Sequence, residues 1–298
     1  SMQDAYIVAY GRAATGRGKA NGAYAHTRAD DVAAQVLKGV IDRVDGDFDP
    51  ALIEDVIVGN AFPEGEQGMN FARTIALRAG LPHTVPGQTV NRYCSSGLQT
   101  IAMAANAIMA GQSDVVAAGG VEFMSAVPMG GNEPTNNPTL QAEDVGASYP
   151  MGLTAENVAE EYDVSREDQD AFAVQSHQRA HAAQEEGRLD DEIIPVEINK
   201  VEYTANGPSV KKVMFDKDEG IRPESSMETL GKLPTIFKAN GTVTAASSSQ
   251  VSDGASFVIL MSGDKVKELG IKPIARFVGY KAVGVDPKLM GIGPAYAI

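Results

Sequence analysis

Short apolar runs alternate with helical periods over the first 122 residues of the chain. Runs rich in Val, Ile and Ala predict β-strands at Ala5–Tyr10, Asp55–Asn60 and Asp114–Gly119. A helix is predicted from about Asp30, because valines recur on one face at Val32, Val36, Val40 and Val44. Strands that alternate with helices indicate an α/β domain with a mostly parallel, helix-covered sheet.

A second helix is predicted after an extended segment, Val85–Val90. The prolines Pro82 and Pro86 keep the approach to this segment out of helix. The run from Leu98 to Met109 is rich in Ala, Met and Ile, and it predicts a helix that is apolar on nearly every side and therefore buried. The turn between strand and helix contains Cys94.

Residues 123–242 have a different pattern, and we expect them to form a loop-rich insertion. One strong helix is predicted within them, capped by Ser165 and terminated by Gly187. The stretch from Pro195 to Gly241 predicts irregular structure. A long loop-rich insertion in an α/β domain is usually functional. Beyond it, Ser256–Met261 predicts a strand that returns to the first sheet, and Ile274–Tyr280 predicts the opening of a second domain.

Composition narrows the classes of function. Hydrophobic residues make up 43 % of the chain, which is enough for a sizeable core. The formal net charge of −14 argues against nucleic acid or an anionic membrane as a partner. No apolar run approaches the length of a membrane span, and no signal segment opens the chain, so we expect no membrane insertion and a cytoplasmic location.

The charges are unevenly distributed along this acidic chain. Between Lys200 and Lys238 basic and acidic residues nearly balance. A phosphate-bearing ligand would meet the least repulsion there. A solvated loop of mixed charge explains the same composition.

Cys94 is the only cysteine in the 298 residues, which excludes an intrachain disulfide and fits a reducing compartment. It opens the predicted helix, where unpaired backbone N–H groups and the macrodipole favour a thiolate. We therefore expect Cys94 to be alkylated faster than a free-peptide cysteine. The alternative is an inert buried thiol.

Five motifs make the chain similar to the thiolase family. They span residues 91 to 294, so the resemblance covers essentially the whole chain, and they lie in the order typical of the family. They are Asn91-Arg92-Tyr93-Cys94-Ser95-Ser96-Gly97-Leu98-Gln99, Gly119-Gly120-Val121-Glu122-Phe123-Met124-Ser125, Met151-Gly152-Leu153-Thr154-Ala155-Glu156-Asn157, Gly241-Thr242-Val243-Thr244-Ala245 with Ser252-Asp253-Gly254-Ala255, and Met290-Gly291-Ile292-Gly293-Pro294.

The resemblance implies a thiolase-like α/β fold, whose complete family form is layered αβαβα. It implies an N-terminal thiolase domain at residues 2–122 plus 243–263. A loop domain that binds coenzyme A is expected at 123–242, and the start of a truncated C-terminal thiolase domain at 272–298.

The implied activity is that of an acyl-CoA C-acyltransferase. It cleaves a 3-ketoacyl-CoA with coenzyme A, or condenses acetyl-CoA in reverse, through an acyl-cysteine intermediate. The resemblance makes Cys94 the nucleophile and assigns Arg222, Ser249 and Met151 to the binding of coenzyme A and the acyl group. It implies no metal and no cofactor apart from coenzyme A as substrate. A homodimer or homotetramer is expected, paired along an apolar edge around Asp114–Gly119.

Three family motifs do not occur in the chain: Asn-Glu-Ala-Phe, the Gly-His-Pro histidine and a second cysteine in Cys-x-Gly. None of the four histidines, at positions 26, 83, 177 and 181, fits those contexts. We therefore expect the 298-residue chain alone to be incomplete and inactive, and a C-terminal portion to carry the acid/base groups.

Other functions remain open. The degradative, β-oxidation type is favoured by Pro150, where the biosynthetic acetoacetyl-CoA type usually has His. The alternatives are a biosynthetic thiolase and a non-catalytic thiolase-like module that binds coenzyme A or lipid. A ketoacyl synthase is disfavoured by the motifs around Thr154 and Thr242. A papain-like hydrolase is disfavoured, because its histidine would have to be one of the four, and all four lie in unsuitable settings.

Overall fold

The computed structural model describes residues 3–298, which form two compact units, so residue 2, the predicted start of the first domain, lies outside it. The first unit contains the residues up to Asn132, Leu189–Gly220 and Val251–Gly279. The second contains Glu133–Arg188, Ile221–Gln250 and Tyr280–Ile298. The three domains expected from the family resemblance stay a prediction.

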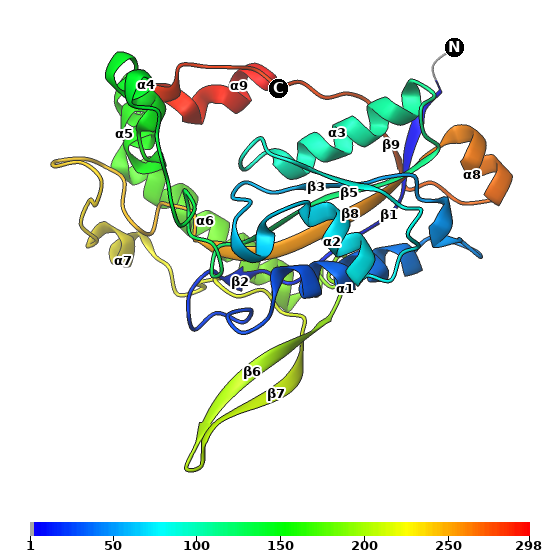
Figure 1. Cartoon of the computed structure of the whole chain (residues 1–298). Coiled ribbons are helices and arrows are strands. Elements are labelled where there is room, and N and C mark those ends of the chain that lie inside the picture. The colour runs from blue at the N-terminus through cyan, green and yellow to red at the C-terminus, as the bar shows by residue number, and fades with distance from the viewer. Residues whose placement is uncertain (1–2) are drawn as a thin grey trace. The chain divides into compact units, whose positions relative to one another are not determined.

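A mixed seven-stranded sheet forms the centre of the first unit (Figure 1). Its strands are β1 (Ala5–Arg12), β2 (Gly16–Arg17), β3 (Val56–Gly59), β4 (Gly87–Val90), β5 (Val115–Phe123), β8 (Ser252–Ser262) and β9 (Ala275–Arg276). The order is β4-β3-β5-β8-β1-β9, with β2 paired to β8. The α/β class is thereby confirmed.

Strand direction shows how far the sheet is parallel. β3 runs parallel to β4 and β5, while β8 is antiparallel to both of its neighbours, β5 and β1. It follows that β1, β3, β4 and β5 share one direction, as the strand–helix alternation predicted. β8 and β9 oppose them, which makes the sheet mixed.

Helices cover both faces of this sheet. They are α1 (Ala29–Asp42), α2 (Phe71–Arg78), α3 (Ser96–Met109) and the short α8 (Gly263–Leu269), with single 3-10 turns η1 (Pro50–Leu52) and η2 (Gly65–Gln67). α1 and α2 lie on one face and α3 on the other (Figure 1). The predicted α1 periodicity is confirmed, because its valines at positions 32, 36 and 40 are buried.

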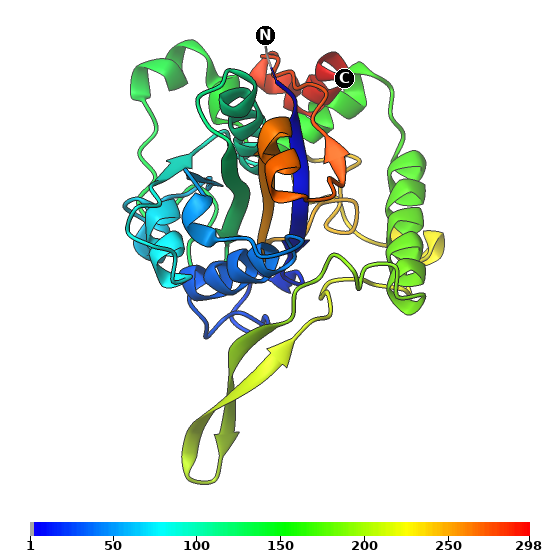
Figure 2. The same ribbon diagram turned by 90° about the vertical axis from the view of Figure 1, so that its right-hand side faces the viewer.

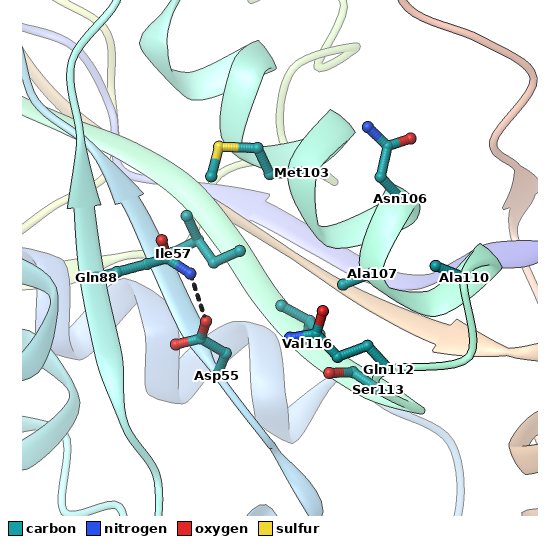
Figure 3. A pocket seen from close by; sticks show the side chains of 10 residues that line it. All are labelled: Asp55, Ile57, Gln88, Met103, Asn106, Ala107, Ala110, Gln112, Ser113 and Val116. Carbon is teal, nitrogen blue, oxygen red and sulfur yellow. Dashed lines mark hydrogen bonds between the residues drawn. The ribbon is translucent and has the colours of Figure 1, made fainter.

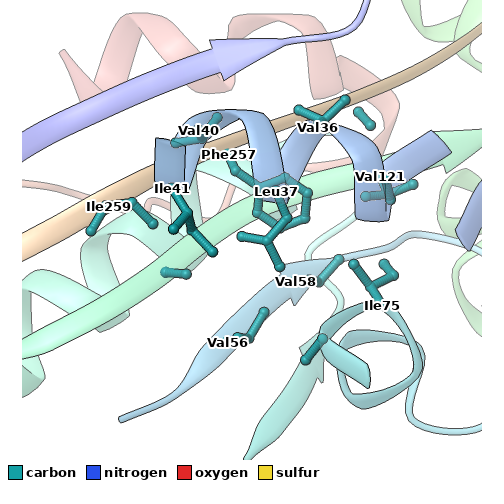
Figure 4. Packing of buried hydrophobic residues seen from close by; sticks show 14 of the residues in the cluster. Val36, Leu37, Val40, Ile41, Val56, Val58, Ile75, Val121, Phe257 and Ile259 are labelled. Carbon is teal, nitrogen blue, oxygen red and sulfur yellow. The ribbon is translucent and has the colours of Figure 1, made fainter. Parts of the chain in front are cut away.

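Alternation of side chains along the strands divides the core between the two faces. In β3, Val56 and Val58 pack with α1 and α2, whereas Ile57 between them packs with α3. Figure 4 shows Leu37 of α1 packed among valines of the sheet and Phe257 of β8. Because successive side chains of a strand point to opposite faces, one apolar strand contributes to the hydrophobic clusters on both faces of the sheet.

α3 is buried at many positions but not at all of them, which corrects the prediction of a helix buried all round. Its alanines Ala104 and Ala105 are fully buried against the sheet. Leu98, which lies near the start of the helix and two turns before Ala105 on the same side, is 60 % exposed. The apolar composition made the helix look uniformly buried, but single apolar positions such as Leu98 remain exposed.

Glycines bring the first turn of α3 unusually close to the sheet. A Cβ on Gly59 of β3 would lie 2.5 Å from the carbonyl carbon of Ser96, and one on Gly120 of β5 would lie 3.2 Å from the Cα of Gly97. The Thr100 hydroxyl also donates a hydrogen bond of 3.0 Å to the Gly119 carbonyl. Backbone packs here directly on backbone, which only glycine permits.

A β-hairpin occupies part of the stretch from Pro195 to Gly241 that was predicted to be irregular, so that prediction is wrong. β6 (Val196–Thr204) and β7 (Gly207–Phe215) form a two-stranded ribbon (Figure 2). Its turn contains Asn206-Gly207, with Gly207 at φ +99°. An Asn-Gly dipeptide between two strand-like runs is a strong hairpin signal, and charged residues along the ribbon masked it.

β5 is an interior strand, which overturns the apolar pairing edge predicted around Asp114–Gly119. β8 pairs with β5 from Val115 to Phe123 on one side, and β3 pairs with Ala117 to Gly120 on the other. Its apolar composition reflects burial within the sheet and not an exposed edge. The ends of the strand order are β4 and β9.

The second unit is mainly helical. Its elements are α4 (Pro138–Glu143), η3 (Val145–Ser148), α5 (Met151–Glu161), α6 (Arg166–Glu185), α7 (Met227–Gly231), η4 (Pro287–Ile292) and α9 (Gly293–Ala297). The predicted α6 is confirmed: the Ser165 hydroxyl accepts from the Asp168 N–H at 3.1 Å, and Gly187 follows at φ +71°. α4 and α7 are short helices within stretches that were predicted as loop.

We expect Gly59→Ala to destabilise the chain by about 1–3 kcal/mol, because the new methyl group would push the first turn of α3 off the sheet. Urea unfolding followed by circular dichroism measures this. Gly254→Ala in β8 is the matched control, since a Cβ there meets no atom within 4 Å. Equal unfolding midpoints for the two variants would contradict the tight contact.

Candidate active site

Cys94 lies in the turn that connects β4 to α3, on the exposed surface of the first unit. Ser95 is the N-cap of α3, so Cys94 comes one residue before the cap. Tyr93 adopts the left-handed conformation, with φ +47°. A non-glycine residue in this conformation is uncommon and costs free energy, so the surrounding contacts must hold it.

Hydrogen bonds fix the turn on both sides of the cysteine. The Asn91 Oδ1 accepts from the Tyr93 N–H at 2.8 Å, an Asx-turn that favours the left-handed Tyr93. The Arg92 N–H donates to the Ser96 Oγ at 2.7 Å, and the Ser96 hydroxyl donates to the Tyr93 carbonyl. These hydrogen bonds therefore fix the backbone on both sides of Cys94, which is itself exposed.

The sulfur of Cys94 has no hydrogen-bonding partner within residues 3–298. The Cys94 N–H likewise donates to no acceptor in this described part of the chain. The arrangement thus presents an accessible thiol together with a free backbone donor, directly before the N-terminus of a 14-residue helix. Such a helix end favours negative charge.

Two carboxylates of the family motifs lie close to this part of the first unit. Burial raises the pKa of Glu122, although Ala61, Gln67 and Asn60 donate hydrogen bonds to its carboxylate. Glu122 was recognised in the sequence only as a motif position without a role. The signal that could have singled it out is an acidic residue at the end of an otherwise apolar strand.

The second carboxylate, Asp253, joins two of the motifs. It is fully buried and accepts from the Ser125 N–H at 2.9 Å and from the Ser125 hydroxyl at 2.5 Å. Burial raises the pKa of Asp253, and these hydrogen bonds oppose the increase. Its hydrogen bonds tie the turn after β5 to the start of β8.

The three predicted ligand-binding residues all lie in the second unit, whereas Cys94 lies in the first. Met151 is the first residue of α5 and is 43 % exposed. Arg222 is exposed, and its backbone N–H donates to the His177 Nδ1 at 3.0 Å. Ser249 is exposed in the segment before β8. Their assigned roles stay predictions.

Glu156 joins two further motifs inside the second unit. Its Oε1 accepts from the Thr242 N–H at 2.8 Å and from the Thr242 hydroxyl at 2.8 Å. A Cβ on Gly241 would lie 1.8 Å from the Glu156 Oε2, so the contact requires glycine. The neighbouring Asn157 Nδ2 donates to the Lys288 carbonyl at 3.0 Å. The motif residues here hold the unit together.

The first unit also has a hollow of about 350 Å³ at the opposite end of α3 (Figure 3). Met103 and Asn106 of α3 line it, together with Ile57 and Gln88 of the sheet, and Gln88 donates to Asp55 at 2.7 Å. Met103, the lining residue of α3 nearest to Cys94 in sequence, is about 14 Å from it along the helix, given the rise of 1.5 Å per helical residue. The hollow is therefore separate from the thiol.

Two kinds of feature are absent from the described part of the chain. Within residues 3–298, no group of three or more His, Cys, Asp or Glu side chains is arranged to hold a metal ion. Over the same range, no helix is both long and apolar enough to cross a membrane.

A family model described as "Thiolase, N-terminal domain" matches residues 5–264. The chain belongs to the thiolase family. It is 48 % identical over 300 residues to a 3-ketoacyl-CoA thiolase of Bacillus subtilis, an alignment that covers 100 % of this chain and 75 % of that protein. The expected family is therefore confirmed, and the chain spans three-quarters of the length of this relative.

Solved thiolase structures share the fold. The acetyl-CoA acetyltransferase of Bacillus anthracis superposes with a TM-score of 0.86 at 39 % identity, covering 100 % of this chain and 75 % of that one. The dimeric peroxisomal thiolase of Saccharomyces cerevisiae superposes with a TM-score of 0.87 at 36 % identity, covering 99 % and 73 %. The thiolase-like fold class is thereby confirmed.

We expect the stability of the wild type relative to Asp253→Asn to fall as the pH rises. Burial raises the folded-state pKa of Asp253, so the folded protein holds this proton more tightly than the unfolded chain does. The resulting stabilisation is complete below the unfolded pKa of about 3.9 and is lost as the pH rises through the folded value. Urea unfolding of both proteins between pH 4 and 8 measures the difference, and a difference that is constant or grows with pH would refute this.

Proposed function

We propose that the chain catalyses acyl transfer as a 3-ketoacyl-CoA thiolase, with Cys94 as the nucleophile. The observation that carries the proposal is the position of the single exposed thiol, in the family's nucleophile motif, directly before the N-terminus of α3. A thiolate attacks carbonyl carbons well and leaves well from a thioester, so it suits both halves of the reaction.

In the first half of the proposed reaction, the Cys94 sulfur attacks the C3 carbonyl of a 3-ketoacyl-CoA. The bond between C2 and C3 breaks, the acyl group stays on the sulfur, and the departing acetyl-CoA carbanion takes up a proton. In the second half, the thiolate of coenzyme A attacks the thioester, and Cys94 leaves as a thiolate. The free Cys94 N–H is suited to stabilise the oxyanion of each step.

The proton transfers need an acid/base group, and we assign it to no residue of this chain. None of the four histidines donates to or accepts from the Cys94 sulfur within the described residues. We therefore propose the acyl-transfer chemistry for Cys94 and propose no residue for the protonation of the carbanion.

We propose that residues 123–242 act as the loop domain that binds coenzyme A. Arg222 would pair with the adenine and phosphate end, Ser249 would contact the pantetheine arm, and Met151 would line the acyl pocket. Their support is the resemblance to the family, in which Met151 opens one of the five motifs, and the exposure of all three residues. The N-terminal domain would then comprise residues 2–122 and 243–263, and 272–298 would begin the C-terminal domain.

The degradative direction is proposed over the biosynthetic one. The relatives from Bacillus subtilis and Saccharophagus degradans, at 48 % and 43 % identity, are both named 3-ketoacyl-CoA thiolase. Pro150, the N-cap of α5, is the local feature that separates this chain from the biosynthetic pattern.

We also propose a homo-oligomer in the cytoplasm. A solved relative is named a dimeric thiolase, and β4 at the end of the sheet offers one unpaired side for association. A single thiol and no disulfide fit a reducing compartment.

We expect the folded chain to acquire an acetyl group from acetyl-CoA on Cys94 several-fold faster than the urea-unfolded chain does. The reason is that only the folded state places the sulfur before the α3 N-terminus. Intact-mass and peptide mass spectrometry locate and time the modification, and Cys94→Ser should remain unmodified. If the unfolded chain reacts as fast as the folded one, the nucleophile assignment fails and the non-catalytic alternative gains support.

We expect Arg222→Gln to weaken coenzyme A binding about ten-fold, because it removes one charge-assisted hydrogen-bond donor to phosphate. Titration calorimetry at fixed ionic strength measures the dissociation constant. Arg179→Gln is the matched control, since it removes an equally exposed positive charge from α6. Equal losses in both variants would show that only net charge matters and would count against a site at Arg222.

A further inference from the structure

We infer that Glu122 is a positioning residue for Cys94, acting through the segment of residues 60–62 and through Asn91. A role of Glu122 in catalysis rests on the proposed function, whereas its effect on the position of Cys94 does not depend on that function. Glu122 lies at the end of β5 and Cys94 lies beyond the end of β4. Hydrogen bonds connect Glu122 to Ala61, Ala61 to Asn91, and Asn91 to Tyr93, the residue that precedes Cys94.

The Glu122 carboxylate is the acceptor on which donors of one loop converge. Its Oε1 accepts from the Ala61 N–H at 2.7 Å. Its Oε2 accepts from the Gln67 Nε2 at 2.9 Å and from the Asn60 Nδ2 at 3.3 Å. The Phe62 N–H also contributes a hydrogen bond. One carboxylate therefore holds residues 60, 61 and 62 in place.

The same loop holds the cysteine turn. The Ala61 carbonyl accepts from the Asn91 Nδ2 at 3.0 Å, while the Asn91 Oδ1 accepts from the Tyr93 N–H at 2.8 Å. The Phe62 ring lies 6.3 Å, centroid to centroid, from the Tyr93 ring. Asn91 uses both ends of its amide, so its orientation depends on where Ala61 lies. A shift of Ala61 would be passed to the strained Tyr93 and hence to Cys94.

The donors around Glu122 cannot turn away from it. The Gln67 Oε1 accepts from the Phe123 N–H at 2.6 Å, which forces the Gln67 Nε2 toward Glu122. The Asn60 Nδ2 also donates to the Val121 carbonyl at 2.9 Å, which fixes the Asn60 amide. Both amide side chains are buried, at 0 % and 1 % exposure for Gln67 and Asn60. Position 122 therefore requires a side chain that accepts on both of its terminal atoms.

Glutamine at position 122 keeps the shape but fails this requirement. Its amide nitrogen would face at least one N–H donor, which leaves two buried donors opposed and unsatisfied. The loop of residues 60–62 would then move to relieve the contact. Asp253 provides the comparison: it is a carboxylate with several donors, and more buried than Glu122, but its partner Ser125 makes no hydrogen bond to the cysteine turn.

The test is the rate constant for alkylation of Cys94 by iodoacetamide in the native protein, measured as a function of pH. We expect Glu122→Gln and Asn91→Ala each to lower the rate about five-fold, as the sulfur loses its fixed place before the α3 N-terminus. Because the two residues act in series, the double variant should react no more slowly than the slower single variant. Asp253→Asn should leave the rate unchanged, whatever it does to the unfolding midpoint.

Unchanged alkylation in Glu122→Gln, with or without lower stability, would overturn the inference by reducing Glu122 to a structural role. If the reductions in alkylation rate of the two single variants multiply in the double variant, Glu122 and Asn91 act independently, and the proposed connection from Glu122 through Asn91 to Cys94 is overturned. Asn91 is exposed, so Asn91→Ala keeps the test decisive if Glu122→Gln does not fold. An unchanged alkylation rate in Asn91→Ala would by itself overturn the inference. Alkylation does not require turnover, so failure of acetyl transfer to Cys94 would count against the proposed function and not against this inference.

Discussion

The approach of α3 to the sheet is the constraint on which the rest of the first unit depends. Gly59, Gly97 and Gly120 let the backbone of the helix meet the backbone of two strands without side chains between them. Because the helix starts so close to the strand ends, the turn before it is short and must pass through a left-handed residue, Tyr93. The exposed thiol is a consequence of this tight geometry.

The polar residues near that turn stabilise a conformation that the hydrophobic core alone would not select. The core clusters on the two faces of the sheet fix the strands and helices, but apolar contacts are non-directional. The orientation of Cys94 is set by hydrogen bonds of Asn91 and Ser96, which are directional. Packing thus places the helix, and the hydrogen bonds place the sulfur.

Local pattern predicted much of this structure, and long-range pairing accounts for most of what it did not predict. The valine period of α1, the cap at Ser165 and the strand–turn–helix around Cys94 depend on neighbours in sequence. The interior place of β5 depends on β8, which lies far along the chain. The donors around Glu122 come from residues more than 50 positions away, and no sequence period could show that they converge on it.

The position of β8 also has a consequence for how the chain is made. β8 lies between β5 and β1, yet β5 ends at Phe123 and β8 begins only at Ser252. At about 5–20 residues per second, a ribosome needs roughly ten seconds to synthesise the intervening segment. Throughout that interval β1 and β5 have no common neighbour, and the hydrogen-bonding edges that β8 will pair with stay open. The nascent chain therefore needs protection from aggregation until β8, which lies between β5 and β1, has been synthesised.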